Sequence, residues 1–393
     1  MNPKAKLAAR AAVVGALSIA EKVRRPVPTG RGDVPVSGAH VTAPWLTAVL
    51  CRDTPGAQVV SFARTGGSRG TSERVGLRVE YNEAGTAAGL PTAIFTKATA
   101  DFKQRMLLGG ADVIAGETQF FMGLRQRVDI EAPQGYWAAV DARSWRSITV
   151  LEDIAATKGA TFLTPTTGFT KSEIVDLVQN LGRLHGPLWG DPALAALKTP
   201  KQYAVNTDAM LDFRKRTAVG MQRSREVMPP ALLGQADRLH DATGRSMELS
   251  TNNPHGTART LLHGDCHAGQ TYRTAAGAMG LCDWQGLLQG NWAFDVAYLI
   301  NTGCEPDDRK AWQDDLLTAY LDALSGAGGP RLSFSEALLT YRQHAFWPYT
   351  AWAFTIGRAF YQPKMQPVDT CLAMVRRTAT AIHELDALEA VGV

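Results

Sequence analysis

The segment from Leu261 to Asp295 constrains this chain most, because acidic side chains follow two of its expected strands. Residues 261–262 look like the end of a buried strand, after which His263-Gly264-Asp265 forms a tight turn. A polar hairpin is expected over 271–282, and its apolar return strand ends at Asp283. The two carboxylates are therefore predicted to lie at neighbouring strand ends.

This pair of carboxylates suits phosphoryl transfer from a nucleotide. In such a reaction one Asp accepts the proton of the attacking hydroxyl, and another holds the magnesium ion that bridges the phosphates of ATP. An amide side chain supplies a second oxygen ligand, and Gln270 follows Asp265 by five residues. The segment is therefore a candidate phosphotransferase centre that uses ATP and Mg²⁺.

Composition narrows the class of protein. The chain has 393 residues, enough for two domains, and 45% of them are hydrophobic, which supplies a sizeable core. The formal net charge is only +4 and there is no long basic run, so no nucleic-acid partner is indicated. The cysteines are scattered without CxxC spacing, which argues against disulfides and structural zinc and favours a reducing cytoplasm: Cys51, Cys266, Cys282, Cys304 and Cys371.

The N-terminus allows two interpretations. Basic residues precede the apolar run 11–20, a pattern that resembles a weak signal peptide. The run is rich in alanine and continues helically through 21–25, which favours an amphipathic surface helix. No apolar stretch reaches the roughly 20 residues that span a bilayer, so stable membrane insertion is not expected. With the Pro- and Gly-rich residues 26–45, this segment forms a predicted helix and arm over 1–45.

Residues 46–153 are predicted to form a small lobe with a five-stranded antiparallel sheet. Alternating apolar residues and turn signals mark strands from 58, 74 and 92, and two more over 136–140 and 147–153. A Gly- and Ser-rich loop over 66–72 joins the first two strands, and its exposed N–H groups suit a phosphate. The candidate nucleotide-binding residues of this loop are Gly67, Ser68, Gly70, Thr71 and Ser72.

Further candidates follow along the same lobe. The third strand ends in Lys97, and Glu117 lies about one helix later. A strand lysine paired with a helix glutamate after a Gly-rich hairpin is the arrangement by which kinases hold the α and β phosphates. In such a plan the backbone at the exit of the last strand, from Glu152 to Ile154, meets the edge of the adenine.

Residues 154–393 are predicted to form a larger helical lobe. Thr170 with Glu173 forms a capping box for a helix that runs to about 189 and carries His185, which we expect to be structural. Asp295 lies on the apolar helix 292–300, where a carboxylate is costly unless bonded. It is therefore predicted to brace the backbone of the catalytic loop. Three more helices are expected over 308–325, 333–361 and 367–390.

Taken in this order, the motifs resemble the aminoglycoside phosphotransferase and choline kinase superfamily, and most of all its ecdysteroid-kinase-like branch. The resemblance covers about residues 58–300 and rests on these elements: Gly70-Thr71-Ser72, Lys97, Glu117 with Phe120-Phe121, Val150-Leu151-Glu152-Asp153, Leu184-His185 with Trp189, His263-Gly264-Asp265, Asp283-Trp284-Gln285 and Trp292 to Asp295. It implies a protein-kinase-like bilobal α+β fold. It also implies ATP and Mg²⁺ in a cleft and phosphorylation of a hydroxyl on a small molecule.

The resemblance also implies individual roles. Asp265 would be the catalytic base, and Asp283 would be the main magnesium ligand. Lys97 would anchor the phosphates, and Glu117 would orient the side chain of Lys97. His263, also placed in the catalytic group, would support the loop. The family usually has Asn where this chain has Gln270, whose stem is longer by one methylene. An inactive nucleotide- or ligand-binding pseudokinase is therefore an alternative to an active enzyme.

The C-terminal region bears on the substrate. A polycationic aminoglycoside needs an acid-lined pocket, and such an antibiotic kinase is one alternative. Here the sequence is aromatic instead, which favours an apolar hydroxylated substrate such as a steroid, polyketide or hydroxyacyl compound, with part of the set expected in the core. The residues concerned are Tyr341, His344, Phe346, Trp347, Tyr349, Trp352, Phe354, Phe360 and Tyr361. A protein substrate is disfavoured by the short segment between Asp283 and Trp292, and a hydrolase by the lack of a nucleophile elbow.

Overall fold

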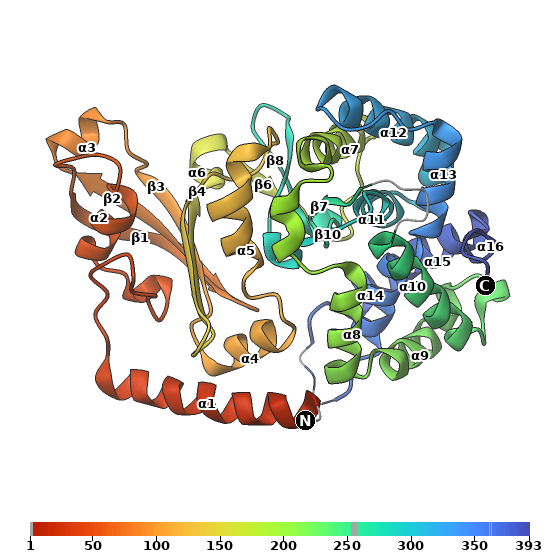
Figure 1. Cartoon of the computed structure of the whole chain (residues 1–393), viewed down its shortest axis with the longest axis horizontal. Coiled ribbons are helices and arrows are strands. Elements are labelled where there is room, and N and C mark those ends of the chain that lie inside the picture. The colour runs from red at the N-terminus through yellow and green to blue at the C-terminus, as the bar shows by residue number, and fades with distance from the viewer. Residues whose placement is uncertain (1–2, 253–257, 361, 363) are drawn as a thin grey trace. The chain divides into compact units, whose positions relative to one another are not determined.

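The computed structural model describes residues 3–252, 258–360, 362 and 364–393, which fall into two compact units (Figure 1). Unit 1 contains the chain up to residue 126 together with 133–160, and unit 2 contains 127–132 together with 161–393. The N-terminal segment before residue 46 lies within unit 1. The short segment 127–132 belongs to unit 2 although the residues on both sides of it belong to unit 1. This excursion was not predicted from the sequence.

Unit 1 is built on a five-stranded antiparallel sheet with the strand order β1-β2-β3-β5-β4. The strands are β1 (Val59–Arg69), β2 (Glu73–Tyr81), β3 (Ala93–Ala98), β4 (Gly135–Asp141) and β5 (Arg146–Glu152). The sheet therefore confirms the predicted five-stranded antiparallel lobe, and with the mostly helical unit 2 it confirms the α+β class.

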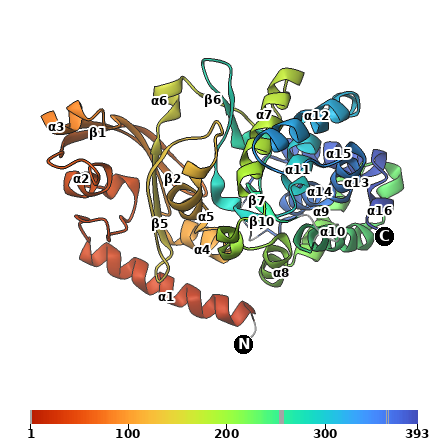
Figure 2. The ribbon, with the colours of Figure 1, turned by 45° about the horizontal axis from the view of Figure 1, so that its top comes forward.

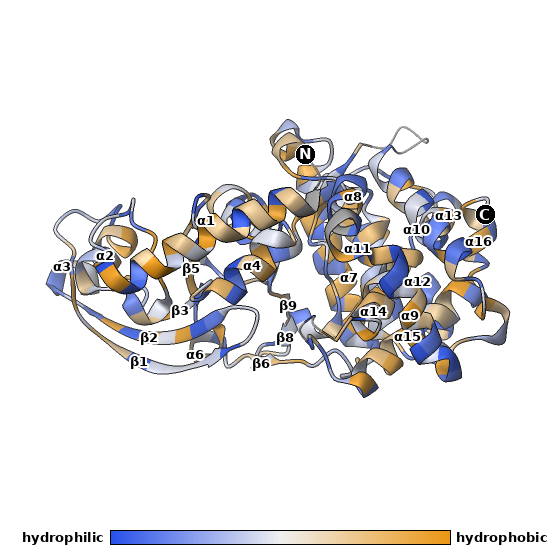
Figure 3. Cartoon of the chain, turned by 90° about the horizontal axis from the view of Figure 1, so that it is seen from below, coloured by the Kyte–Doolittle hydropathy of each residue, from blue (hydrophilic) through white to orange (hydrophobic). Residues whose placement is uncertain are grey.

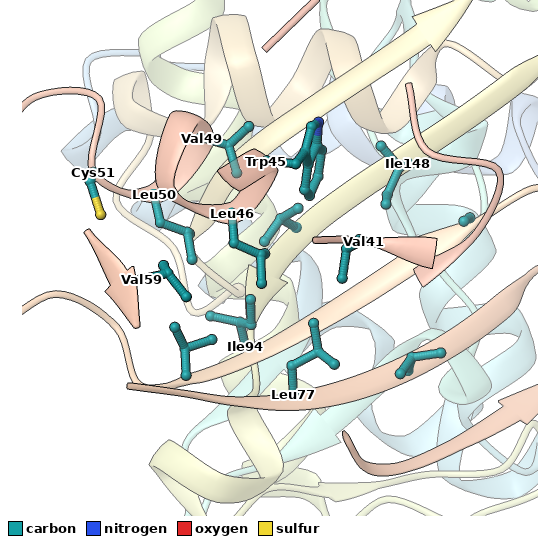
Figure 4. Packing of buried hydrophobic residues seen from close by; sticks show 14 of the residues in the cluster. Val41, Trp45, Leu46, Val49, Leu50, Cys51, Val59, Leu77, Ile94 and Ile148 are labelled. Carbon is teal, nitrogen blue, oxygen red and sulfur yellow. The ribbon is translucent and has the colours of Figure 1, made fainter. Parts of the chain in front are cut away.

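The core of unit 1 lies between this sheet and helix α2 (Ala43–Leu50). Trp45 and Leu46 of α2 are fully buried against Ile94 and Ile148 of the sheet (Figure 4). Because side chains alternate along a strand, Lys97 of β3 points to the opposite face, where α5 (Gly116–Gln119) lies (Figure 2). One face of the sheet thus holds the apolar core, and the other presents the polar groups.

The remaining helices of unit 1 are α1 (Pro3–Arg24), α3 (Glu83–Ala87), α4 (Phe102–Gly110) and α6 (Ile154–Lys158). The fully buried guanidinium of Arg105 in α4 donates to Glu21 of α1 at 2.7 Å. Figure 3 shows orange and blue residues along α1, and among its apolar side chains Val14 is buried whereas Ile19 and Val23 are exposed. Within the described residues, no helix is long and apolar enough to cross a membrane.

Unit 2 is mostly helical. Its helices are α7 (Lys171–His185), α8 (Pro200–Leu211), α9 (Phe213–Ser224), α10 (Ala236–Thr251), α11 (Ala293–Gly303), α12 (Pro306–Gly326), α13 (Phe334–Gln343), α14 (Phe346–Ile356), α15 (Val368–Glu384) and α16 (Ala387–Ala390). Short strands form two small sheets, β7 (Thr260–Leu262) with β10 (Leu288–Gly290), and β6 (Thr161–Phe162) with β8 (Thr271–Arg273) and β9 (Met279–Leu281). The hairpin predicted over 271–282 is confirmed, as is the capping box of Thr170 and Glu173.

Two of the predicted C-terminal helices are wrong in extent. The stretch 333–361 is broken after Gln343, where His344 and Ala345 turn the chain between α13 and α14, and Tyr361 lies outside the described residues. The stretch 367–390 is broken at Asp386, whose φ of +46° is incompatible with a continuous helix. The first break lies just before Pro348, which lacks the N–H that a continuous helix would need at that position.

Candidate active site

The turn that carries Asp265 is braced by a buried carboxylate. The side chain of Asp295 on α11 is fully buried and accepts hydrogen bonds from the backbone N–H groups of His263, at 2.6 Å, and Gly264, at 2.9 Å. Its Oδ2 also lies 3.3 Å from Nε2 of His185, whose Nδ1 bonds Tyr320. The predicted brace is confirmed, and His185 is structural as predicted.

Gly264 is required by the shape of this turn. Its φ is +84°, a conformation that L side chains rarely adopt. A Cβ at this position would lie 2.0 Å from the carbonyl oxygen of Gly286, far inside van der Waals contact. The middle residue of the His-Gly-Asp turn therefore has a steric reason to be glycine.

Both ring nitrogens of His263 bond backbone groups around the Asp265 turn. Its Nδ1 accepts from the N–H of Asp265 at 3.3 Å, and its Nε2 donates to the carbonyl oxygen of Cys282 at 3.0 Å. One neutral tautomer satisfies both bonds. The ring also packs on Trp284, with centroids 4.6 Å apart. His263 therefore ties the Asp265 turn to the end of β9.

The carboxylate of Asp265 is 40% exposed and is surrounded by polar groups. Nε2 of Gln270 donates to its Oδ2 at 3.2 Å, and Nε2 of His267 lies 3.8 Å from the same oxygen. The hydroxyl of Tyr298 also bonds Asp265, and burial raises the pKa of that phenol well above its usual value. These contacts hold the carboxylate in place while leaving it accessible.

Sequence reasoning missed His267 and Tyr298. Tyr298 follows Asp295 by three residues on one helix, so the two side chains share a face, and this spacing is the signal that was available. His267 follows Asp265 by two residues. Burial lowers the pKa of His267, while the charges of Asp265 and Asp283 act in the opposite direction. The charges of both carboxylates therefore reach the same imidazole, which agrees with the prediction that Asp265 and Asp283 lie at neighbouring strand ends.

Asp283 begins a turn with a left-handed backbone, φ +64° and ψ +69°, which Asp adopts more readily than most residues. No group of three or more His, Cys, Asp and Glu side chains that could hold a metal occurs within the described ranges. Magnesium needs few protein ligands, since phosphates and waters complete its octahedron. Asp283 and Gln270 are the residues predicted to hold this ion, and Nε2 of Gln270 faces Asp265.

In unit 1 the predicted lysine–glutamate pair is present. Nζ of Lys97 lies 2.8 Å from Oε1 of Glu117, and the hydroxyl of Thr149 on β5 donates to Oε2 at 3.1 Å. Both charged side chains are more than 90% buried. A pair this enclosed holds the ammonium in one place, which a phosphate-binding lysine requires.

The Gly-rich loop is shorter than predicted. Gly67 and Ser68 are strand residues of β1 that pair with Val75 and Arg74, so the expectation of a loop over 66–72 is wrong. The turn itself contains only 70–72, and Nε2 of Gln104 donates to the carbonyl oxygen of Gly70 at 2.9 Å. At Gly67 a Cβ would lie 2.6 Å from the carbonyl oxygen of Arg74. Gly67 thus allows close pairing of the two strands.

Three more predicted nucleotide-binding residues, Ser72, Glu152 and Ile154, differ in the polar groups that they present. Ser72 is 1% exposed, and its Oγ has no hydrogen-bond partner among the described residues. The N–H of Glu152 is bonded to the carbonyl oxygen of Gln134, and its carboxylate accepts from Thr157. Ile154 is the first residue of α6, so its N–H has no acceptor within that helix. Of the pair predicted to meet adenine, the N–H of Glu152 is therefore already bonded within unit 1.

The aromatic C-terminal stretch is mainly core. Tyr341 and Phe346 are fully buried, whereas Phe360 is 94% exposed. Trp352 packs edge-on against His267 at 5.3 Å between centroids, which brings one aromatic residue of the set close to Asp265. The expectation that part of this set forms core is therefore confirmed.

Comparison with known proteins gives a partial match. A model of the ecdysteroid kinase-like family matches residues 196–327, about a third of the chain. No curated protein matches the sequence. Among solved structures, choline kinase LicA from Streptococcus pneumoniae is 13% identical, with 83% of this chain and 94% of that chain covered and a TM-score of 0.43.

Two further solved structures are similar at the same level. An aminoglycoside phosphotransferase from Alicyclobacillus acidocaldarius is 12% identical over 90% of this chain and 98% of that chain, with a TM-score of 0.46. Plasmodium vivax ethanolamine kinase is 12% identical over 84% and 83%, with a TM-score of 0.44. The stretch that holds Asp265, Asp283 and Asp295 thus matches the ecdysteroid kinase-like family, which confirms the resemblance inferred from its motifs.

Proposed function

We propose that this protein is an ATP- and Mg²⁺-dependent phosphotransferase that phosphorylates a hydroxyl group of a small, apolar molecule. The observation that carries the proposal is the bracing of the Asp265 turn by Asp295. A buried carboxylate that holds two consecutive N–H groups fixes the backbone, while the next side chain stays accessible. A base for a substrate hydroxyl needs this combination of rigidity and access.

The roles of the residues follow from their contacts. Asp265 would accept the proton of the attacking hydroxyl, with Gln270 and Tyr298 fixing its orientation. Lys97, held by Glu117, would bind the phosphates of the nucleotide. Asp283 and the Oε1 of Gln270 would hold Mg²⁺, which neutralises phosphate charge when bound. Ser72 and Ile154 would offer polar groups to the nucleotide.

The proposed acceptor is an apolar alcohol, because aromatic side chains lie near Asp265: Tyr298 bonds its carboxylate, and Trp352 packs on the neighbouring His267. ATP consumption would be measured with Mg²⁺ and a panel of steroid, polyketide-like and hydroxyacyl alcohols beside kanamycin-like aminoglycosides. We expect turnover with apolar alcohols and none with aminoglycosides. Turnover confined to aminoglycosides would overturn the substrate class while leaving the phosphotransferase in place.

An inactive nucleotide-binding protein is the alternative, and the contact of Gln270 with Asp265 gives it a physical basis. An amide directed at the base has less freedom to reach a metal ion. Nucleotide binding and ATP consumption would be measured side by side for the wild type and Asp265→Ala. Equal consumption by both proteins across the panel, with nucleotide still bound, would favour the inactive form.

A further inference from the structure

Helix α1 packs on the rest of unit 1 with one of its sides. Val14 on this side is fully buried. Glu21 lies on the same side, where its carboxylate accepts from the buried guanidinium of Arg105 at 2.7 Å and lies 3.5 Å from Nε of Arg146. With 3.6 residues per turn, Val14 and Glu21 are about two turns apart and so share this side of the helix. The opposite side of α1 is therefore directed away from the rest of unit 1.

The side of α1 opposite Val14 is apolar and exposed. Its larger side chains Val13, Ile19 and Val23 are 42%, 67% and 78% exposed. Alanines fill the rest of this outer face, which consists of the following exposed residues: Ala5, Ala8, Ala9, Ala12, Val13, Ala16, Ile19 and Val23. Phe102 of α4, itself 42% exposed, extends the apolar surface beside Gly15, where an added Cβ would lie 3.6 Å from its ring. Apolar area gathered in one place on a protein surface is typical of an interaction site.

Exposed cations border the outer face on both sides. Helical periodicity places Lys22 along one border and Lys6 and Arg24 along the other, and all three residues are exposed. The acid of α1, Glu21, is directed inward and paired with arginines. Among the described side chains of α1, the charge around the outer face is therefore positive throughout.

An apolar face between cationic borders fits the surface of an anionic membrane. A second copy of α1 on the same face would bring like charges together, which is unfavourable. At a lipid surface the apolar side chains enter the boundary of the acyl chains, while the Lys and Arg stems extend toward the phosphate groups. The anionic headgroups then attract each cation near the surface.

We infer that α1 binds in the plane of an anionic lipid surface, with its outer face toward the acyl chains, and so attaches the protein to that surface. Because most of the outer face is alanine, its apolar area alone is small, and binding needs anionic headgroups as well. The inference does not depend on the proposed phosphotransfer, since α1 contains none of the residues assigned to that reaction.

The test measures sedimentation of the full chain with vesicles of phosphatidylcholine, with and without phosphatidylserine, at low ionic strength. We expect at least tenfold tighter binding to the vesicles that contain phosphatidylserine, and loss of this binding at about 0.5 M NaCl, where the charges are screened. Lys22→Gln combined with Arg24→Gln should weaken binding about 25-fold, because each cation near an anionic surface contributes about fivefold. Lys215→Gln combined with Lys310→Gln, on exposed positions of α9 and α12, is the matched control and should bind like the wild type.

A second pair of variants tests the apolar face. Ile19→Gln combined with Val23→Gln keeps every cation and should weaken binding at least tenfold, and both positions are exposed enough that the fold should tolerate the change. Val60→Gln combined with Val205→Gln, at valines that are 64% and 62% exposed outside α1, should bind like the wild type. No binding to phosphatidylserine vesicles, equal binding to both kinds of vesicle, or loss of binding in either control would overturn the inference. Undiminished binding of Ile19→Gln with Val23→Gln would also overturn it, because α1 would then contact polyanions through charge alone.

Discussion

Replacing Asp295 by Asn tests the brace on the catalytic turn. The substitution keeps the shape of the side chain and removes its charge, and an amide has only one oxygen to accept the N–H groups of His263 and Gly264. One charge-assisted hydrogen bond, at 2.6 or 2.9 Å, is lost, and a buried N–H then faces the NH₂ group of Asn. Such a change costs about 3 kcal/mol of unfolding free energy.

The assay combines urea denaturation with hydrogen exchange of the His263 and Gly264 amides. Local loosening should lower protection at these two amides more than elsewhere, and displacement of Asp265 should reduce turnover by about 100-fold. Asp314→Asn on the exposed surface of α12 is the matched control, expected to stay within about 0.5 kcal/mol of the wild type. Unchanged protection in Asp295→Asn would refute the reasoning.

Three more predictions follow from the same contacts. Gly264→Ala should lose several kcal/mol and all activity because of the clash with Gly286, whereas Gly277→Ala, with a similar φ of +88° and no neighbour within 4 Å, should lose about 1–2 kcal/mol in urea denaturation. Burial lowers the pKa of His344 from 6.5 to about 4, so the unfolded chain binds a proton that the folded chain does not. Unfolding free energy should therefore fall by about 3 kcal/mol between pH 6.5 and 4, and His344→Gln should remove this share from a urea series across that range. Glu117→Gln should raise the KM for ATP at least tenfold and lower the free energy of unfolding by about 3 kcal/mol. In the double variant with Lys97→Met, the loss of unfolding free energy should be smaller than the sum of the losses in the two single variants, which would show that the two side chains are coupled.

Much of this arrangement could be predicted because local rules and tertiary structure agree. The sheet, the capping box of Thr170 and the pairing of Lys97 with Glu117 follow from periodicity, caps and order along the chain. Asp295 was predictable because a carboxylate on an apolar helix must find donors. Each of these signals lies in a few neighbouring residues.

Other features depend on contacts that the sequence does not display. The strand character of Gly67 and Ser68 comes from pairing with β2, which overrides the preference of glycine for turns. The contact of Tyr298 with Asp265 requires α11 to pack against the turn. The break after Gln343 separates α13 from α14, and helical periodicity alone gives no sign of it.

Transfer of the labelled γ-phosphate of ATP to an alcohol tests the central claim most directly. Wild type and Asp265→Asn would be incubated with Mg²⁺, ATP and the alcohol panel, and labelled organic product would be counted after separation from phosphate. We predict product from at least one alcohol with the wild type and at least a 100-fold lower rate with Asp265→Asn. Equal product with both proteins, or none with a wild type that binds ATP, would contradict the account.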